Sequence, residues 1–181
     1  RRLTRARALP RGGRQGHTEG ITFLAPKGDG RYFLSNGKDQ KAKLWDVRAM
    51  GNDRIPQKFK AAAYAFDYRW QRYPKNPEHV THPYDTSVMS FIGHKVLNTL
   101  IRVNWSPMET TGQRYVFSGS ACGAVYVYDV LTGEVAAKLQ YHNAVVRDCD
   151  WHPSQPVLAS VGWDGYVARW ANFDAPPPPP Q

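Results

Sequence analysis

A threefold repeat constrains this chain of 181 residues more than any other feature. The copies occupy residues 16–48, 93–130 and 131–173, and each runs from a histidine to a closing aromatic residue. Within each copy, short segments rich in β-branched and aromatic residues alternate with Gly, Pro and Asp turns, which predicts strands. No segment of the copies has the periodicity of an amphipathic helix. The repeat therefore predicts an all-β protein built from stacked copies of one unit.

The copies resemble the repeats of WD-repeat proteins, in which each unit forms a four-stranded blade of a β-propeller. The resemblance covers nearly all of residues 16–173. It implies that His, Ser, Asp and Trp side chains within a blade form a buried relay of hydrogen bonds. The residues at these positions are His17, Ser35, Asp39 and Trp45 in the first copy and His142, Ser160, Asp164 and Trp170 in the third.

The second copy departs from this pattern, because Cys122 and Tyr128 stand at the positions of Asp and Trp, although His94 and Ser118 are present. We therefore expect its relay to be incomplete. A hydrogen bond contributes about 1 kcal/mol net to stability. On this basis the sequence predicts a larger loss of stability from His17→Ala than from His94→Ala.

Three blades cannot close a ring, since propellers have about four to eight blades. We therefore expect an incomplete ring, the C-terminal part of a propeller whose other blades precede residue 16. The chain does not begin with Met, which also indicates processing or a fragment. The Pro-rich residues 174–181 are expected to follow the last blade as a tail. Such a piece alone is expected to expose a blade face and sheet edges and to aggregate.

The net charge of +9 comes mainly from residues 1–15, which contain six Arg and no acidic residue. A basic run with few apolar residues is expected to form a disordered tail. Nucleic-acid binding through this tail is an alternative function, but the charge lies outside the repeats, so we do not predict nucleic acid as a partner. The two Cys are too few for a disulfide framework, and no apolar run is long enough to span a membrane.

Residues 49–92 form an insert that is too long for an ordinary connection between two blades. Its Tyr68, Arg69 and Trp70 are candidate partner-binding residues, because long insertions on a rigid scaffold often carry binding function. An alternative of equal weight is that Phe66, Tyr68 and Trp70 cover the rim of the blade.

The sequence contains no convincing catalytic, metal-binding or cofactor-binding arrangement. Cys149, Asp150 and His152 are close in sequence, but strand alternation places Cys149 on the face opposite to the other two. We expect Cys149 to be a buried core residue. His79 and His82 have a spacing that zinc could use, but no further pair of His or Cys lies near them in the sequence. The prediction is therefore a protein that is not an enzyme and needs no metal or cofactor.

The first copy closes with Trp45-Asp46-Val47-Arg48, a Trp-Asp-x-Arg box that the other two copies lack. The box resembles that of substrate receptors of cullin-four RING ubiquitin ligases, which dock on a propeller adaptor named damage-specific DNA-binding protein one. The resemblance implies that Trp45, Asp46 and Arg48 bind this adaptor. Arg48 would project from the blade as a forked donor suited to acidic or carbonyl partners. Segments of the repeats and of the insert, including residues 67–71, resemble one such receptor in particular.

The resemblance implies a non-catalytic subunit of a cullin-four ligase, found in the nucleus and cytoplasm. Such a subunit recruits a target protein for ubiquitination and proteasomal degradation, and the sequence does not identify the target. The alternative is a WD-repeat scaffold for protein–protein interaction with no role in ubiquitination, in which Arg48 would be incidental.

Overall fold

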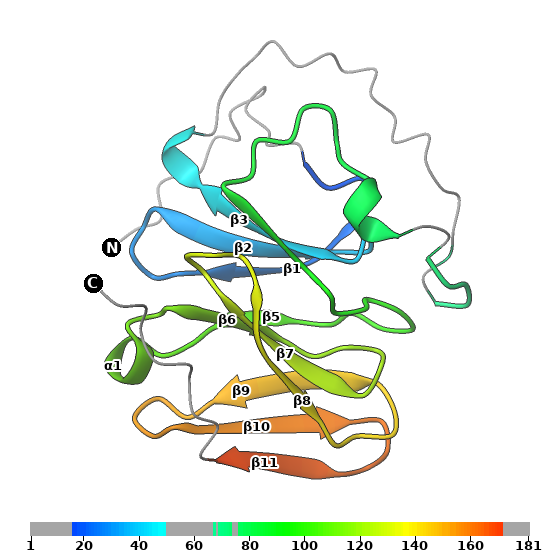
Figure 1. The fold of residues 1–181 in the computed structure, drawn as a ribbon, viewed down its shortest axis with the longest axis vertical. Coiled ribbons are helices and arrows are strands. Elements are labelled where there is room, and N and C mark those ends of the chain that lie inside the picture. Colours follow the sequence, from blue (N-terminus) through cyan, green and yellow to red (C-terminus); the bar gives the residue numbers. More distant parts are fainter. Residues whose placement is uncertain (1–15, 50–66, 68, 74–75, 172–181) are drawn as a thin grey trace, which may run out of the picture.

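The computed structural model describes residues 16–49, 67, 69–73 and 76–171. This part of the chain is almost entirely β, as predicted, and its three antiparallel sheets are stacked face to face along the long axis of the molecule (Figure 1). The strand order is β1-β2-β3-β4 in the first sheet, β5-β6-β7-β8 in the second and β11-β10-β9 in the third. The predictions for residues 1–15, Phe66, Tyr68 and the Pro-rich tail fall outside the described residues.

The strands are short and the helical segments are shorter. The strands are β1 (Ile21–Pro26), β2 (Tyr32–Gly37), β3 (Lys41–Asp46), β4 (Met89–Ile92), β5 (Val103–Trp105), β6 (Tyr115–Ser118), β7 (Ala124–Asp129), β8 (Val135–Gln140), β9 (Val146–Trp151), β10 (Val157–Gly162) and β11 (Val167–Ala171). The helical segments are η1 (Val47–Ala49), η2 (Pro77–His79) and α1 (Met108–Thr111). None of the helices in the described ranges is long and apolar enough to cross a membrane.

The core lies between the sheets, and strand β7 of the middle sheet is buried along its whole length. Successive side chains of a strand point to opposite faces. Tyr126 and Tyr128 accordingly pack in the cluster shared with the first sheet, while Val125 and Val127 pack in the cluster shared with the third. Burial on both faces explains why β7 is a continuous apolar run rather than an alternating one.

The insert lies within the first sheet rather than between two blades. Strand β4 follows the insert and pairs with β3, with Met89 opposite Leu44. The structure therefore differs from the predicted division at residue 92, because the outer strand β4 of the first sheet stands just before His94 in the sequence. The same shift of one strand occurs in the second sheet, where β8 lies beyond the predicted boundary at residue 130 and pairs with β7.

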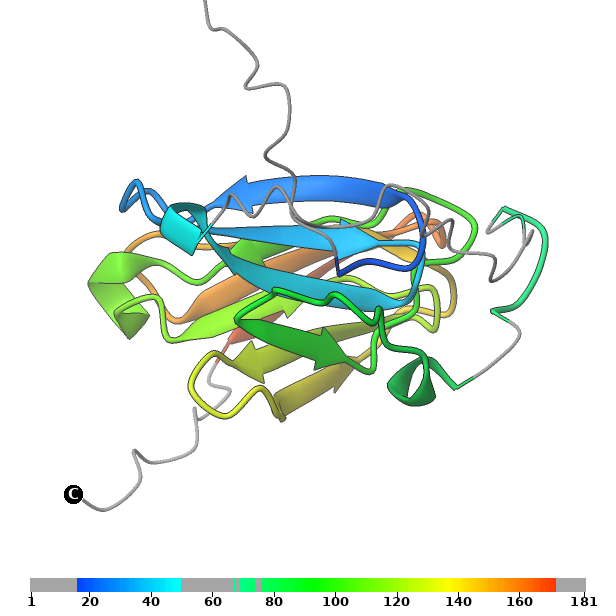
Figure 2. The same cartoon turned by 90° about the horizontal axis from the view of Figure 1, so that it is seen from above.

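The strands of the stack end on two sides that carry different features (Figures 1 and 2). One side holds η1, α1 and the β7–β8 turn, and we call it the Arg48 end. The other side holds the loops with His17, His94 and His142 together with the described part of the insert, and we call it the histidine end.

The two outer sheets of the stack expose large apolar side chains. Ile21 and Leu24 of β1 are 54% and 56% exposed, and Trp163, Tyr166 and Val167 of the third sheet and its turn are 57%, 59% and 74% exposed. Side chains of this kind are normally covered in a folded domain. The exposed faces fit the expectation of an incomplete ring.

Candidate partner-binding site

The predicted relay residues of the first sheet lie within hydrogen-bond distance of one another. Trp45 Nε1 donates to Ser35 Oγ at 2.6 Å, Ser35 Oγ lies 2.6 Å from His17 Nε2, and His17 Nδ1 lies 2.8 Å from Asp39 Oδ1. Because a carboxylate only accepts, His17 carries its proton on Nδ1 and accepts from Ser35 at Nε2. The donation therefore runs in one direction, from Trp45 to Asp39.

The third sheet repeats this arrangement. Trp170 Nε1 donates to Ser160 Oγ at 2.9 Å, Ser160 Oγ lies 2.9 Å from His142 Nε2, and His142 Nδ1 lies 3.0 Å from Asp164. Asp164 also accepts the backbone N–H of Asn143 at 3.0 Å. The aspartate thus holds the strand-connecting loop as well as the histidine.

His94, the histidine of the second repeat, has different hydrogen-bond partners from His17 and His142. Ser118 Oγ donates to backbone carbonyls instead of meeting His94. The Tyr128 hydroxyl lies 2.8 Å from His94 Nδ1 and accepts the His94 backbone N–H at 3.0 Å. His94 Nε2 lies 2.9 Å from Asn36 Oδ1, and Asn36 Nδ2 donates to the Ile101 carbonyl at 3.0 Å. His94 therefore links the second sheet to the first.

These contacts fix the tautomer of His94 as the reverse of that in the relays. Asn36 offers its oxygen to the ring, so His94 Nε2 carries the proton and Nδ1 accepts from the Tyr128 hydroxyl. Burial lowers the pKa of His94 to about 4, which keeps the ring neutral at physiological pH. The expectation that His94→Ala is the milder substitution does not follow from this geometry, since His94 is 1% exposed and its two ring nitrogens and backbone N–H all have partners.

The Trp-Asp-x-Arg box places only one of its predicted docking residues at the surface. Trp45 is 2% exposed and serves the relay. Asp46 Oδ2 accepts from Arg31 Nε at 3.1 Å and Nη2 at 2.9 Å, and Asp46 Oδ1 accepts the Arg48 backbone N–H at 2.9 Å. The Arg48 side chain is exposed on η1.

In the first sheet, Arg31 pairs with Asp46, and Asp46 accepts the backbone N–H two residues later; we call this arrangement the clamp. The second sheet contains the same clamp, but the residue two positions after the aspartate is not an arginine. Arg114 Nε and Nη2 donate to Asp129 Oδ2 at 2.9 and 2.8 Å, and Asp129 Oδ1 accepts the Leu131 backbone N–H at 2.8 Å. Leu131 thus stands where Arg48 stands in the first sheet, and it is 73% exposed. The two positions form a natural comparison within one molecule.

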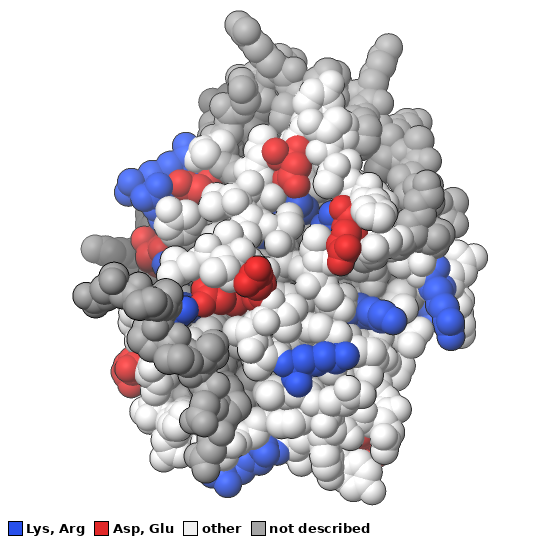
Figure 3. All heavy atoms as spheres, in the orientation of Figure 1, with Lys and Arg blue, Asp and Glu red and all other residues white. Residues whose placement is uncertain are grey.

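On the face of the described residues that Figure 3 draws, charges are mixed rather than gathered into one basic field. Figure 3 shows Lys and Arg interspersed with Asp and Glu over the face that it draws. At the Arg48 end, the neighbouring Val47 in η1 exposes an apolar side chain, and Met108 of α1 is exposed at the same end. An arginine among exposed apolar side chains is typical of a protein interface rather than of a phosphate-binding surface.

The described part of the insert is anchored to the first sheet by buried lysines of β3. Lys41 Nζ donates to the Val80 carbonyl at 2.8 Å. Lys43, which is 1% exposed, donates to Asp85, Ser87 and Ser90. Sequence analysis missed this anchor, because lysines in a strand normally indicate a solvated face and Asp85 is distant in sequence.

At the histidine end, the insert forms one wall of a pocket of about 790 Å³. Trp70 lines it and is 83% exposed, while Arg69 is ion-paired with Asp67. Lys95 and Cys122 belong to the opposite wall. Of the candidate insert residues, Trp70 therefore faces open space and Arg69 is held by a neighbour.

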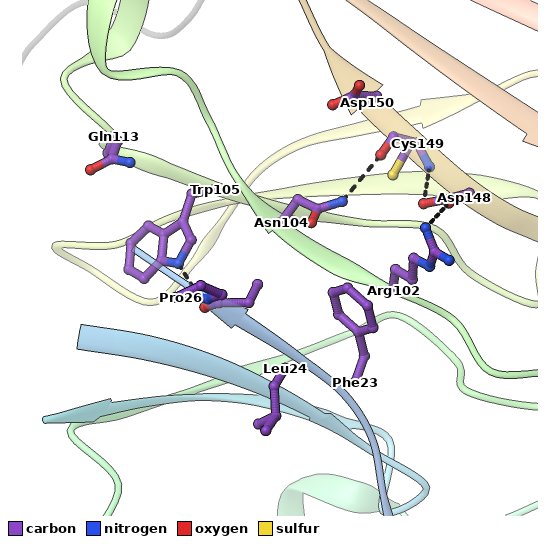
Figure 4. A pocket seen from close by; sticks show the side chains of 11 residues that line it. Phe23, Leu24, Pro26, Arg102, Asn104, Trp105, Gln113, Asp148, Cys149 and Asp150 are labelled. Carbon is purple, nitrogen blue, oxygen red and sulfur yellow. Dashed lines mark hydrogen bonds and ion pairs between the residues drawn. The ribbon is translucent and has the colours of Figure 1, made fainter. Parts of the chain in front are cut away.

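A second pocket of about 500 Å³ lies along the innermost strands β1, β5 and β9 (Figure 4). Arg102 pairs with Asp148 at 2.9 Å, and Asn104 Nδ2 donates to the Cys149 carbonyl at 3.3 Å, so both contacts join neighbouring sheets. Cys149 is buried, as predicted, and burial raises the pKa of its thiol. A raised pKa disfavours the thiolate that a nucleophile requires.

Comparison with known proteins agrees with this architecture. The model of the WD domain, G-beta repeat, matches residues 10–46 and 133–170. The chain is 46% identical over 179 residues to the LEC14B protein of Lithospermum erythrorhizon, a match that covers 97% of this chain and 38% of the relative. It is 45% identical over 159 residues to the DDB1- and CUL4-associated factor 11 homolog of Caenorhabditis elegans, covering 86% of this chain and 27% of the relative.

A shorter match, 34% identical over 86 residues, links the chain to DDB1- and CUL4-associated factor 6 of Homo sapiens and covers 48% of this chain and 10% of the relative. The chain thus spans less than two fifths of the length of the curated relatives it matches. The repeat model matches the first and third sequence copies, and the second copy contributes to a sheet of the same design between them. The chain belongs to the WD-repeat family of β-propeller proteins.

Proposed function

We propose that this chain is part of a substrate receptor of a cullin-four RING ubiquitin ligase, acting in the nucleus and cytoplasm. The observation that carries the proposal is the exposed Arg48 held on η1 at the end of the Trp-Asp-x-Arg box. The names of two relatives, DDB1- and CUL4-associated factors 11 and 6, support the same partners. The role is non-catalytic, and other subunits transfer ubiquitin.

Arg48 is the docking residue of this proposal. Its backbone is fixed by Asp46, and its guanidinium has no hydrogen bond or ion pair to the described residues. The fixed backbone lowers the entropy lost on binding, because only the side chain of Arg48 has to be ordered, and arginine is enriched among interface hot spots. The exposed apolar side chain of Val47, the preceding residue in η1, adds apolar surface beside Arg48.

The pocket beside Trp70 is the candidate surface for the target protein. It lies at the histidine end, opposite to Arg48, so an adaptor at one end leaves the other accessible (Figure 1). The anchor of Lys43 to Asp85 holds the insert in place beside this pocket. An exposed tryptophan beside a pocket favours binding of a protein segment, because aromatic residues are enriched at protein interfaces.

The test is co-purification of the adaptor and cullin-four with the full-length protein from cells. Wild type and Leu131→Ala are expected to recover the adaptor, whereas Arg48→Ala is expected to lose it by about tenfold or more, as for an interface hot spot. Equal recovery with Arg48→Ala would show that docking does not use this box. Absence of the adaptor from all three preparations would favour the alternative of a WD-repeat scaffold without a role in ubiquitination.

A further inference from the structure

We infer that Arg31, which lies outside the Trp-Asp-x-Arg box, is a positioning residue for docking, and that Asp46 acts through Arg48 rather than by touching the adaptor. This inference rests on the proposed function. Arg31 stands at the start of β2, whereas the box closes β3. The two segments meet because β2 and β3 are antiparallel neighbours, with Tyr32 opposite Asp46.

Both carboxylate oxygens of Asp46 already accept hydrogen bonds from this chain. Its Oδ2 atom takes both donors of Arg31, at 3.1 and 2.9 Å, and its Oδ1 atom takes the Arg48 backbone N–H at 2.9 Å. The Asp46 side chain is 14% exposed. Because Asp46 Oδ1 accepts the Arg48 backbone N–H, these hydrogen bonds fix the backbone at Arg48.

Arg31 is itself held from three sides. Its guanidinium carbon lies 4.8 Å from the centroid of the Tyr32 ring, a cation–π arrangement. Its backbone N–H donates to Asp29 Oδ1 at 2.8 Å, and its carbonyl accepts the Val47 backbone N–H at 2.8 Å. Arg31 consequently orders η1 twice, through Val47 directly and through the Asp46 carboxylate.

The second sheet has the same clamp but a different residue at the position of Arg48, so the effect of the clamp can be tested apart from the effect of that residue. Arg114, Asp129 and Leu131 are connected as Arg31, Asp46 and Arg48 are, and the Arg114 carbonyl accepts the Val130 backbone N–H at 2.9 Å. The clamp is thus a device of the blade, and only the presented side chain differs. Removing the clamp in the first sheet should affect docking, whereas removing it in the second should not.

The experiment is a double-mutant cycle on the full-length protein with purified adaptor, using Arg31→Gln, Arg48→Ala and the pair together. Arg31→Gln is expected to weaken binding about threefold to tenfold, because Arg48 must then be ordered on association. The double variant should bind within about twofold of Arg48→Ala alone, since Arg31 acts through Arg48. Arg114→Gln is the matched control and should bind as wild type does.

Hydrogen exchange of the same variants reports positioning without the adaptor. The Arg48 amide should exchange faster in Arg31→Gln, and the Leu131 amide should exchange faster in Arg114→Gln. Unchanged exchange at Arg48 would overturn the inference. So would losses that multiply in the double variant, because Arg31 would then contact the adaptor itself or act on the whole fold.

Failure of the inference and failure of the proposed function give different patterns. If Arg48→Ala weakens binding and Arg31→Gln does not, only the inference about Arg31 is wrong. If Arg48→Ala binds as tightly as wild type, the proposed docking site is wrong, and the docking role of Arg31 is wrong with it.

Discussion

Removing a single oxygen atom from Tyr128 is expected to loosen the junction between the first and second sheets. The Tyr128 hydroxyl is fully buried, accepts the His94 backbone N–H and donates to His94 Nδ1. In Tyr128→Phe both groups of His94 lose their partner in a place that water does not reach. A buried polar group left unpaired costs about 1–3 kcal/mol. The expected loss is therefore about 2–6 kcal/mol for the two groups together.

Hydrogen exchange measures this loss locally and is suited to the full-length protein. A loss of about 2–6 kcal/mol corresponds to exchange that is faster by about 30-fold to 20,000-fold, since about 1.4 kcal/mol is a factor of ten. The amides to follow are those of β2 and of residues 93–103, on both sides of the His94 bridge. The acceleration should be concentrated there and weak in the third sheet, which has its own relay.

Tyr126→Phe is the matched control for Tyr128→Phe. Tyr126 lies on the same face of the same strand, is 8% exposed, and its hydroxyl has a sulfur contact to Cys122 at 3.9 Å. Loss of so weak a contact should cost less than about 1 kcal/mol. If Tyr128→Phe accelerates exchange no more than Tyr126→Phe, the assigned bridge through His94 does not stabilise the junction.

Two further predictions concern His94 and the insert. Burial lowers the pKa of His94 to about 4, below an unfolded value of about 6.5, so its contribution is complete above pH 6.5 and is lost as pH falls toward 4. Opening of the junction should therefore become easier by up to about 3 kcal/mol between pH 7 and pH 4, and hydrogen exchange should show a flatter pH dependence in His94→Gln. In Lys43→Met the insert loses its buried anchor, worth about 1–3 kcal/mol, so limited proteolysis within residues 67–88 should accelerate. The exposed Lys138→Met should not change proteolysis, and equal effects of the two would contradict the anchor.

Much of the fold was predictable because turn residues mark the ends of the strands in each copy of the repeat. Short β-rich runs between Gly, Pro and Asp turns predict the strands, and the positions of His17 and Trp45 in the repeat place them in one hydrogen-bonded chain. The alternation in β9 likewise placed Cys149 and Asp150 on opposite faces, and in the structure Cys149 is buried while Asp150 is exposed. These features depend on residues of one blade, whose separation in the sequence is fixed by the family pattern.

What the sequence did not predict depends on contacts between distant segments. The bridge from His94 to Asn36 spans two sheets, and the pair of Lys43 with Asp85 joins β3 to the far side of the insert. The fourth strand of the first sheet, β4, follows the insert in the sequence, so the prediction from sequence included it in the insert. The pairing of Asp46 with Arg31 was also not predicted, because Arg31 lies outside the Trp-Asp-x-Arg box.

The account rests on Arg48 as the docking residue, and an equilibrium binding measurement between the purified adaptor and the full-length protein tests it most directly. The account predicts that Arg48→Ala raises the Kd by about tenfold or more, while Leu131→Ala at the matching position of the second sheet changes it by less than about threefold. Both substitutions truncate exposed side chains held by the same clamp, so folding should be unaffected in each. An unchanged Kd for Arg48→Ala, or equal losses for the two variants, would contradict the account.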